Sequence, residues 1–450
     1  MENKPKFTIS GYRGIWGKDL DEQITFEFAT AFAKIIKKGG GKKILVGRDA
    51  RKSGVLMLWA IKSAFKKEGL EMDNAGIIPA PSVLLLVKKL FYDGGIIITA
   101  SHNGIEYNGL KFVMKTGLFA DSNEIKEINK IKENLNEKYI VSKNNNKEEN
   151  DNEKFRKIHI NEILKNIDVD IIRSKKYKAT LDPINSAGSI IIPELLKELG
   201  CSVSIINGDQ SGEFAHTPEP LVKNLNQISE AVRTNNSEIG FAVDPDADRL
   251  VIVNEKGEIL SEEYTIVLAI KNVLSKYPSD VAVNMSTSRM CEDITNSFGK
   301  KVFRTKIGEL NVVKKMIEIN SNISGEGNGG VIYPKINTAR DTLVGIALIL
   351  ELMAKENKSV SSIVESLPKY IMKKEKITFD GNVDFLNEKL KRIFSNADSV
   401  DILDGIRFNW KDSSWIHIRP SNTEPKMWII SEAKDMTRVD YLFEQVKSVL

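Results

Sequence analysis

The sequence predicts an α/β fold with three similar α/β units and a smaller C-terminal α+β unit. Short β-branched runs alternate with segments of helical periodicity through the first 120 residues, and the alternation begins again at Lys178 and at Tyr264. Such a rhythm is typical of parallel or mixed sheets with helices on both faces. From residue 370 onward the chain instead contains aromatic, β-rich runs and closes with a helical segment. Three similar units before a distinct one indicate internal repetition.

The first unit alternates strand and helix patterns. Its helix has apolar residues at the spacing of one helical face. Its last strand is a run of isoleucines, which suits a strand buried on both faces. The expected elements are strands at residues 43–46, 76–78 and 96–98 and a helix at residues 54–67, with Val55, Leu58, Trp59 and Ala60 toward the core.

The strands and helices of the later units are assigned from the same apolar patterns, and Gly200 indicates the end of a helix. The expected strands lie at residues 179–182, 202–206, 239–243, 281–284, 302–304, 415–418 and 427–431. The expected helices lie at residues 190–199, 264–274, 290–297 and 438–449.

A polar stretch at residues 142–154 lacks apolar side chains and cannot contribute to a core, so we place the first domain boundary near it. The changes of pattern define the other boundaries. The predicted domains are residues 1–150, 151–253, 254–369 and 370–450.

Composition narrows the class of protein. The 450 residues include 65 basic and 61 acidic side chains, and the formal net charge of +4 indicates neither a nucleic-acid nor a membrane partner. Cys201 and Cys291 are too few for a disulfide framework, so we expect a cytoplasmic protein. The four histidines lack zinc-binding spacing, and no apolar run approaches the roughly 18 residues of a membrane span. Monomer and homodimer both remain open.

A serine follows the expected strand at residues 96–98. Ser101 lies just past its carboxyl end, where open α/β sheets place their ligands. His102 adds an imidazole beside this hydroxyl, and Lys111 adds a cation or proton carrier about one loop away. The segment lacks the flanking glycines of an esterase nucleophile elbow, so an acyl-transfer triad is not expected. Taken alone, it also suits an ordinary polar turn.

The densest array of carboxylates follows the expected strand at residues 239–243. Asp244, Asp246 and Asp248 alternate along the loop and repel one another unless a cation lies between them. Hard oxygen ligands at this density suit Mg²⁺, and Arg249 can pair with a carboxylate or a phosphate. The glycine and distal glutamate of an EF-hand are missing. An acidic surface turn is the alternative, and we expect the loop to face solvent.

A second strand-to-loop junction, residues 417–426, offers cations, hydroxyls and amides, the groups of a phosphate clamp. An ordinary polar turn is the alternative. The clamp candidates are Arg419, Ser421, Asn422 and Thr423.

Residues 324–330 place four glycines around Glu326 and Asn328, a carboxylate and a carboxamide that suit sugar hydroxyls. The loop lacks the Lys-Ser/Thr ending of a P-loop and alone also suits a flexible loop. Other expected loops also contain basic residues. Each of these, considered alone, is expected to be a charge on the protein surface. These positions are Arg13, residues 47–51, and Lys306 in the segment that contains Gly308.

Together these motifs resemble the α-D-phosphohexomutase family, which includes phosphoglucomutase/phosphomannomutase and phosphoglucosamine mutase. The segments that carry the resemblance are residues 99–103, 244–249, 325–330 and 419–425, and it runs from Arg13 to the clamp. It implies four domains around a central cleft. It also implies that Ser101 is a phosphoserine in the active enzyme, beside one Mg²⁺ held by Asp244, Asp246 and Asp248 together with Ser101.

The chain departs from the usual family pattern at five positions, which bear on substrate choice. These are Gly104 for proline, Asn328 and Gly330 for serine and histidine, Asn422 for glycine, and Trp428 for arginine. The segments 185–188 and 214–220 favour a phosphoglucosamine mutase.

The resemblance implies interconversion of hexose 1-phosphate and hexose 6-phosphate through a bisphosphate, with hexose 1,6-bisphosphate as activator. Ser101 would carry the phosphoryl group, with His102, Lys111, Arg13 and Arg249 as the other catalytic residues. Lys306, Gly308, Glu326 and Asn328 would bind the sugar, and Arg419, Ser421, Asn422 and Thr423 the phosphate that does not react. The alternatives are a broad phosphoglucomutase/phosphomannomutase, an aspartyl-phosphate phosphatase using Asp244, and a non-catalytic sugar-phosphate binder.

Overall fold

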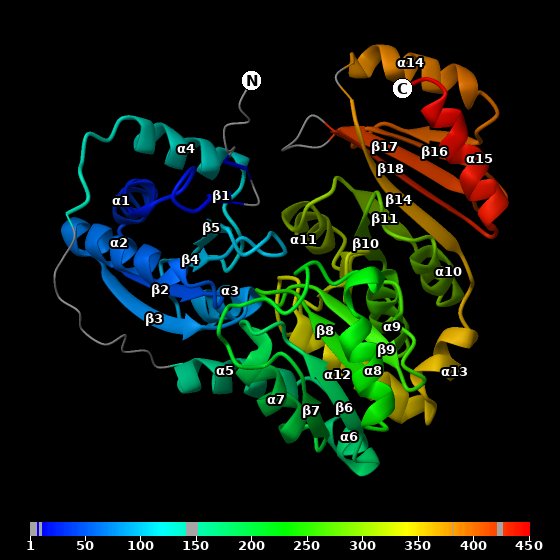
Figure 1. Ribbon diagram of the computed structural model, residues 1–450, viewed down its shortest axis with the longest axis horizontal. Coiled ribbons are helices and arrows are strands. Elements are labelled where there is room, and N and C mark those ends of the chain that lie inside the picture. Colours follow the sequence, from blue (N-terminus) through cyan, green and yellow to red (C-terminus); the bar gives the residue numbers. More distant parts are fainter. Residues whose placement is uncertain (1–6, 9–10, 141–151, 380, 421–425) are drawn as a thin grey trace.

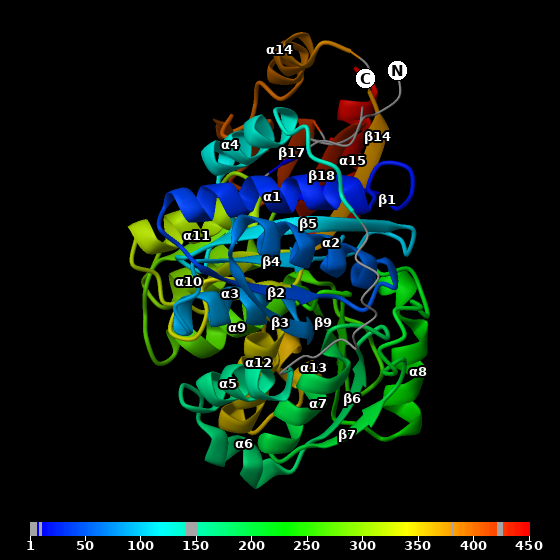
Figure 2. The ribbon, with the colours of Figure 1, turned by 90° about the vertical axis from the view of Figure 1, so that its left-hand side faces the viewer.

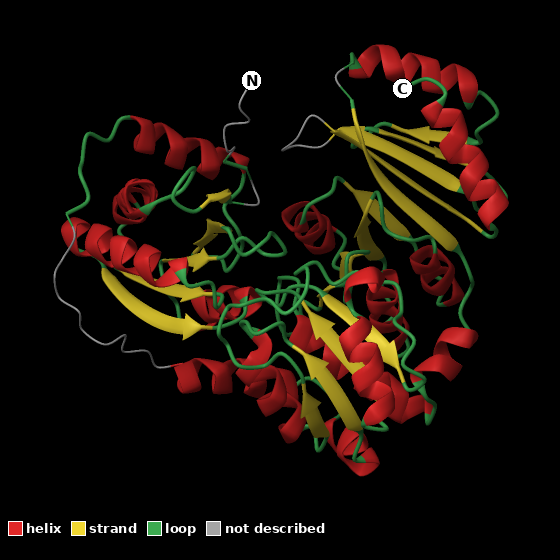
Figure 3. Ribbon diagram, viewed as in Figure 1, coloured by secondary structure: helices red, strands yellow, loops and turns green. Residues whose placement is uncertain are grey.

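The computed structural model describes residues 7–8, 11–140, 152–379, 381–420 and 426–450, and its strands form four sheets. Figure 1 shows the first unit in blue at the left and the fourth in orange and red at the upper right, with the other two between and below them. Helices pack around each sheet, as the colouring by secondary structure in Figure 3 shows. The predicted fold class, three similar α/β units and a smaller α+β unit, is confirmed.

The first three sheets share one strand order. In each sheet, four strands follow one another in the chain: β2 to β5, β6 to β9 and β10 to β13. The first of the four pairs in parallel with the second and the third, and the third pairs with the antiparallel fourth. The orders are β3-β2-β4-β5 in the first unit, β7-β6-β8-β9 in the second and β11-β10-β12-β13 in the third. The first sheet adds β1, antiparallel to β5. This repeated topology agrees with the repetition that the sequence indicates.

Helices and strands alternate along the chain in each of the first three units. The first unit has β1 (Tyr12–Ile15), α1 (Glu22–Lys38), β2 (Lys43–Arg48), α2 (Ser53–Glu68), β3 (Glu71–Ile77), α3 (Ala80–Lys89), β4 (Gly94–Ile98), β5 (Tyr107–Met114) and α4 (Ser122–Glu133). The second has α5 (Asn152–Leu164), α6 (Val169–Lys175), β6 (Lys178–Asp182), α7 (Gly188–Glu198), β7 (Ser202–Ile205), a 3₁₀ turn (Val222–Asn224), α8 (Asn226–Thr234), β8 (Ile239–Val243) and β9 (Leu250–Asn254). The third has α9 (Glu263–Leu274), β10 (Val281–Asn284), α10 (Met290–Ser297), β11 (Val302–Thr305), α11 (Glu309–Glu318), β12 (Ser324–Glu326), β13 (Gly330–Ile332), α12 (Thr342–Glu356) and α13 (Val360–Glu365).

The fourth sheet is antiparallel throughout, in the order β14-β18-β17-β16-β15. Its helices and strands enclose an apolar core of their own, separate from the core that runs through the first three units. The elements are β14 (Ile371–Thr378), α14 (Val383–Ile393), β15 (Ser399–Asp401), β16 (Ile406–Asn409), β17 (Trp415–Pro420), β18 (Lys426–Ala433) and α15 (Met436–Lys447).

Aspartate caps fix the start of several helices near the site. The Asp121 carboxylate accepts the first amides of α4 in a capping box with Glu124, and Asp341 accepts from Leu343 and Val344 at the start of α12. These bonds satisfy amides that a helix start leaves unpaired. α12 itself is apolar on nearly every side because it is buried within the shared core.

A buried histidine joins the first three units. His159 of α5 contacts Ser82 Oγ of α3 through Nδ1 at 2.8 Å and the Asp341 carboxylate of α12 through Nε2 at 2.9 Å. Figure 2, the side view, shows α3 beside the first sheet, with α5 and α12 below it. The three units are therefore connected by polar contacts as well as by a common apolar core.

Two local expectations are wrong. β3 starts at Glu71 instead of residue 76, because parallel pairing with β2 holds its polar first half at the sheet edge. Trp59 of α2 is 39% exposed and does not face the core, since Leu58 and Ala60 fill that side. The domain divisions at 150, 253 and 369 stay predictions, although β9 extends one residue past 253. In the described parts of the chain, no helix combines the length and apolar character needed to span a membrane.

Candidate active site

Equivalent loops of the three similar sheets carry the predicted site. Each loop connects the third strand to the antiparallel fourth: Ser101 follows β4, the aspartates follow β8, and Asn328 follows β12. The shared topology brings the loops to one cavity of about 190 Å³. The predicted residues that line it are Arg13, Ser101, His102, Lys111, Arg249, Gly308, Glu326 and Asn328.

Ser101 is held in an unusual backbone conformation. Its φ is 50°, in the left-handed region, and the residue is 1% exposed. Thr99 Oγ1 accepts its amide at 2.8 Å, and Arg51 donates to its carbonyl at 2.8 Å. The hydroxyl lies 3.0 Å from Asp244 Oδ2 and 3.2 Å from His102 Nδ1. A left-handed non-glycine residue stabilised on every side is a common feature of functional loops.

The support for this serine corrects one expectation. Arg48, Asp49 and Arg51 are buried and are not surface charges. Arg51 pairs with Asp49, and Asp49 Oδ2 accepts from Thr99 Oγ1 at 2.7 Å. The loop after β2 is therefore a structural support beneath the serine loop.

The three aspartates form a buried cluster, so the expectation of a solvent-facing loop is wrong, as is the alternative of an acidic surface turn. One ligand oxygen from each of Asp244, Asp246 and Asp248 lies within 4.8 Å of the others. Among the described residues, Asp246 Oδ1 and Asp248 Oδ1 have no hydrogen-bond partner. Burial, and then the two neighbouring carboxylates, raise the pKa of Asp244 well above its usual value. Buried carboxylates with unpaired oxygens fit a divalent cation.

Cations surround the cluster on the side of the cavity. Lys111 Nζ lies 2.7 Å from Asp246 Oδ2 and 3.7 Å from Asp248 Oδ2, and against the opposing effect of burial this ammonium lowers the pKa of Asp246. Arg13 donates to Asn103 Oδ1 at 3.0 Å. Burial and then Arg249 hold the pKa of His102 well below its usual value, so the imidazole is neutral near pH 7.

The sugar-loop candidate Glu326 is buried and accepts from four donors. These are Asn284 Nδ2 at 2.8 Å, the Gly308 amide at 3.1 Å, Arg340 Nη1 at 3.0 Å and Asn328 Nδ2 at 3.5 Å. Asn328 Oδ1 is buried and has no partner among the described residues. Both side chains line the cavity, so a ligand would meet a carboxylate and a carboxamide there.

Arg419, the clamp residue that the structure describes, lies apart from this cavity. Arg419 of β17 is 8% exposed, its Nε lies 3.6 Å from Asp404 Oδ1, and it is absent from the cavity lining. Ser421, Asn422 and Thr423 lie outside the described residues. Lys306 is exposed and also does not line the cavity.

Sequence reasoning missed several site residues because their partners are distant in the sequence. Arg340 joins the aspartate loop to the sugar loop, and Glu309 accepts from it. Glu219 Oε1 accepts from Arg249 Nη1 at 3.3 Å and lies 4.0 Å from His102 Nε2. Arg340 directly precedes the cap of α12, which is a weak signal, and nothing in the sequence indicates its distant partners.

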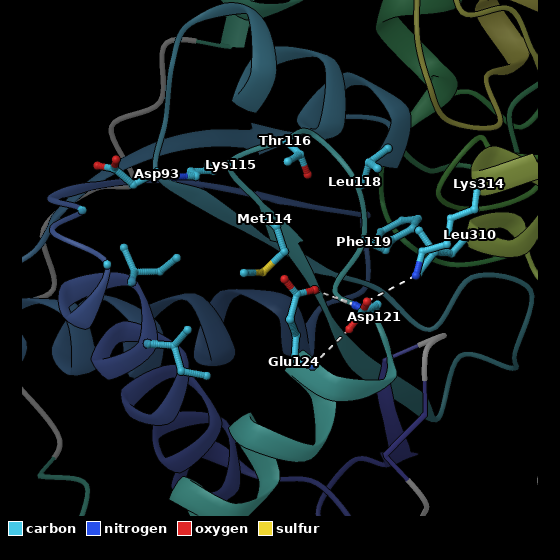
Figure 4. A pocket seen from close by; sticks show the side chains of 14 residues that line it. Asp93, Met114, Lys115, Thr116, Leu118, Phe119, Asp121, Glu124, Leu310 and Lys314 are labelled. Atoms are coloured by element: carbon cyan, nitrogen blue, oxygen red, sulfur yellow. Dashed lines mark hydrogen bonds and ion pairs between the residues drawn. The ribbon is translucent and has the colours of Figure 1, made fainter. Parts of the chain in front are cut away.

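A second cavity, of about 410 Å³, lies beside the first one, between the first and third units. Phe119 and Leu310 line both cavities. Figure 4 shows this space, with Lys314 of α11 reaching Asp121 at 3.2 Å beside it. The capping box of α4 and this ion pair occupy both Asp121 and Glu124, so neither carboxylate is left unpaired there.

Comparison with known proteins matches the first three units individually. Residues 4–139, 157–257 and 261–370 match the phosphoglucomutase/phosphomannomutase alpha/beta/alpha domains I, II and III. A phosphoglucomutase/phosphomannomutase of Thermococcus kodakarensis is 34% identical, with 95% of this chain and 94% of the relative covered. A phosphoglucosamine/phosphogalactosamine mutase of Sulfurisphaera tokodaii is 32% identical, with 99% and 98% covered.

Solved structures share the whole architecture. A phosphoglucomutase/phosphomannomutase family protein of Burkholderia thailandensis has a TM-score of 0.84 at 24% identity, covering 99% of this chain and 98% of its own. N-acetylphosphoglucosamine mutase of Aspergillus fumigatus, solved with GlcNAc-6P and magnesium, has a TM-score of 0.57 at 13% identity, covering 93% and 79%. With a relative above 30% identity along nearly the full chain, the resemblance in the motifs is confirmed, and the protein belongs to the phosphoglucomutase/phosphomannomutase family.

Proposed function

We propose that this phosphohexomutase moves a phosphoryl group between C6 and C1 of a hexose through phospho-Ser101. The observation that carries the proposal is the buried Ser101 hydroxyl, 3.0 Å from Asp244 Oδ2, in the same cavity as Glu326 and Asn328. A phosphorylatable hydroxyl, a metal-binding cluster and groups for sugar hydroxyls meet in one place. A protein that only bound sugar phosphates would not need the aspartate cluster beside this serine.

The reaction balances as two phosphoryl transfers. In the first, the P–Oγ bond of phospho-Ser101 breaks, a P–O bond to the free sugar hydroxyl forms, and a bisphosphate results. The hydroxyl proton passes to a base at the site, for which neutral His102 is the candidate, and the released Ser101 Oγ takes up a proton, for which the Lys111 ammonium is the candidate donor. The bisphosphate then turns over and returns its other phosphoryl group to Ser101. Such transfers depend mainly on positioning and charge neutralisation.

The residues present fit one Mg²⁺ per chain. Asp244, Asp246 and Asp248 supply buried carboxylate oxygens, and the Ser101 oxygen lies beside them. When bound, the cation offsets the charge of the transferring phosphoryl group. Arg13 and Arg249 face the same cavity and would hold phosphate oxygens there.

The remaining predicted residues would recognise the substrate. Glu326 and Asn328 would bind ring hydroxyls, with Gly308 and Lys306 contributing from the segment between β11 and α11. Arg419, Ser421, Asn422 and Thr423 of the fourth unit would bind the phosphate that does not react. Hexose 1,6-bisphosphate would act as activator by phosphorylating Ser101.

We further propose phosphoglucosamine as the preferred substrate. The Sulfurisphaera relative named for amino-sugar phosphates supports this choice, while the Thermococcus relative supports a broad phosphoglucomutase/phosphomannomutase as the second candidate. A cytoplasmic location and a monomer or homodimer stay predictions.

The test is 1/6 isomerisation of glucose, mannose, glucosamine and N-acetylglucosamine phosphates, with Mg²⁺ and catalytic bisphosphate. We expect the highest kcat/KM for glucosamine phosphate; highest turnover of glucose or mannose phosphate would support the second candidate. Phosphate binding without turnover of any sugar would indicate a binding protein. A hydroxylamine-labile phosphoenzyme would indicate an aspartyl-phosphate phosphatase.

A further inference from the structure

Arg340 makes contacts that no predicted site residue makes. Its Nη2 lies 2.6 Å from Asp248 Oδ2, its Nη1 lies 3.0 Å from Glu326 Oε2, and its Nε lies 3.1 Å from Glu309 Oε2. One guanidinium therefore links the aspartate loop of the second unit to the sugar loop of the third. Its side chain is 11% exposed and lines the cavity.

The Arg340 backbone is fixed as firmly as its side chain. The amide donates to Glu309 Oε1 at 2.9 Å, so Glu309 accepts from both the amide and the guanidinium. The next residue, Asp341, caps α12, a helix buried in the shared core. A planar guanidinium held in this way can set the spacing of its partners, which a flexible lysine ammonium cannot do.

Gly330 provides the space for this arginine. A Cβ at residue 330 would lie 2.3 Å from Arg340 Cδ and 2.8 Å from Arg340 Cγ. The φ of Gly330 lies outside the left-handed region, so its backbone accepts alanine and it is chiefly the arginine that excludes a side chain. Gly330 is one of the positions at which the chain departs from the usual family pattern, and this departure leaves the space that Arg340 occupies.

We propose that Arg340 is a positioning residue that couples the metal loop to the sugar loop, and that Gly330 is required to admit it. The proposal rests on the proposed function, since it assigns the two loops to metal and sugar. Through Asp248 the guanidinium orients one carboxylate of the metal cluster, and through Glu326 it orients the group that receives ring hydroxyls. Arg340 thereby holds the two loops at the spacing that one bound sugar phosphate requires.

The test compares Arg340→Lys and Gly330→Ala with wild type. Lysine keeps the charge but carries all its donors on one nitrogen, so it cannot span the three carboxylates as the guanidinium does, and alanine at 330 displaces the arginine without removing it. Matched controls are Arg156→Lys, which disrupts a two-point pair with Glu194 outside the cavity lining, and Gly39→Ala at a helix end with a negative φ. The readouts are Mn²⁺ affinity by electron paramagnetic resonance, glucosamine 6-phosphate affinity by calorimetry, KM and kcat, and melting temperature.

We expect both site variants to weaken Mn²⁺ binding by about 10- to 100-fold. Both should also weaken sugar phosphate binding and raise KM, while the controls keep wild-type values. Because Gly330→Ala acts through Arg340, adding it to Arg340→Lys should produce little further loss. If Arg340→Lys does not fold, Gly330→Ala, which retains the arginine, gives the same test.

Wild-type metal affinity and KM with only a lower melting temperature would overturn the proposal, because they indicate a purely structural arginine. Additive losses in the double variant would overturn the role of Gly330. The proposed function fails separately, if wild-type protein isomerises no hexose phosphate. In that case the Mn²⁺ measurements still decide whether Arg340 orients the metal loop.

Discussion

At the residue scale, the site depends on groups whose ordinary properties are changed by burial. Ser101 has a left-handed backbone, Asp244 has a raised pKa, and His102 stays neutral among cations. Residues from other parts of the chain lie against these groups: Arg51 donates to the Ser101 carbonyl, Lys111 donates to Asp246 in the same cluster as Asp244, and Arg249 donates to Glu219. We therefore expect substitutions of the site residues to change activity more than stability, and substitutions of the supporting residues to change both.

Ser101→Ala should abolish mutase activity, because it removes the oxygen that carries the phosphoryl group. Intact-mass spectrometry should show a phosphate adduct on wild-type protein that the variant lacks. Ser63→Ala, in α2 and outside the cavity lining, is the control and should behave as wild type. Full activity in Ser101→Ala would refute the phosphoserine assignment.

Asp246→Asn should weaken binding of Mn²⁺ by roughly tenfold or more, because the cluster loses one ligand charge. The melting-temperature increase that Mg²⁺ gives to wild-type protein should shrink accordingly. Because Lys111 pairs with this carboxylate in a buried site, stability without metal must be measured alongside. Asp209→Asn, at an exposed aspartate, is the control, and an unchanged metal response in Asp246→Asn would contradict the metal assignment.

At the element scale, one topological position is used three times for different chemistry. The loop between the third and fourth strands holds Ser101, the proposed phosphoryl carrier, in the first unit, the carboxylate cluster in the second and the proposed sugar-binding groups in the third. The loop at residues 214–220 of the second unit also contacts the first unit. Phe214 lies under the Arg51 guanidinium at 4.9 Å, and Glu219 lies near His102. Its position is set partly by His216, whose Nε2 lies 3.1 Å from Asp182 Oδ2.

His216 should make stability depend on pH. Although burial opposes protonation, the Asp182 carboxylate raises the pKa of His216 above its usual value. The unfolded value is about 6.5, so the stabilisation is fully present below that pH and is lost as pH rises through the higher folded pKa. Urea unfolding at pH 6 and pH 8.5 should show this loss in wild type and a smaller one in His216→Asn. Equal pH dependence in both proteins would contradict the pairing.

At the scale of the whole molecule, the fourth unit differs from the others in how it is attached. Its core is separate, and polar contacts connect it to the third unit. Lys374 binds Glu262 at 2.8 Å and Glu263 at 2.7 Å, and the Arg289 amide donates to Glu432 Oε2 at 2.8 Å. A polar interface of this kind permits domain movement more readily than a shared apolar core. A hinge near Pro368, between α13 and β14, is therefore our prediction for closure over the cavity.

Arg419→Ala should raise KM for both the 1-phosphate and the 6-phosphate. Substrate and product carry phosphate at opposite ends, so one clamp remote from Ser101 must bind a phosphate in both half-reactions. The loss of charge-assisted contact should reduce kcat/KM by about 2–4 kcal/mol in each direction. Steady-state kinetics in both directions test this, with Arg392→Ala in α14 as the exposed control. An effect in one direction only would contradict a single clamp for both orientations.

The sequence by itself determined what local chemistry can determine. Strand ends followed by Ser101, by three alternating aspartates and by a glycine-rich acidic loop were visible because each motif lies within a few residues. The repeated strand–helix rhythm likewise predicted the three similar units, since apolar periodicity is a local property.

Tertiary structure alone decided which charges are buried and which groups meet. The polar composition of residues 47–51 and of the aspartate loop suggested solvent, yet both are buried, because partners from other loops compensate their charges. Arg340 lies 92 residues from Asp248, and Glu219 lies 30 residues from Arg249, so neither pairing has a local signature. The cost of burying a charge is offset only by what the fold brings beside it, and that information resides in the packing of the units.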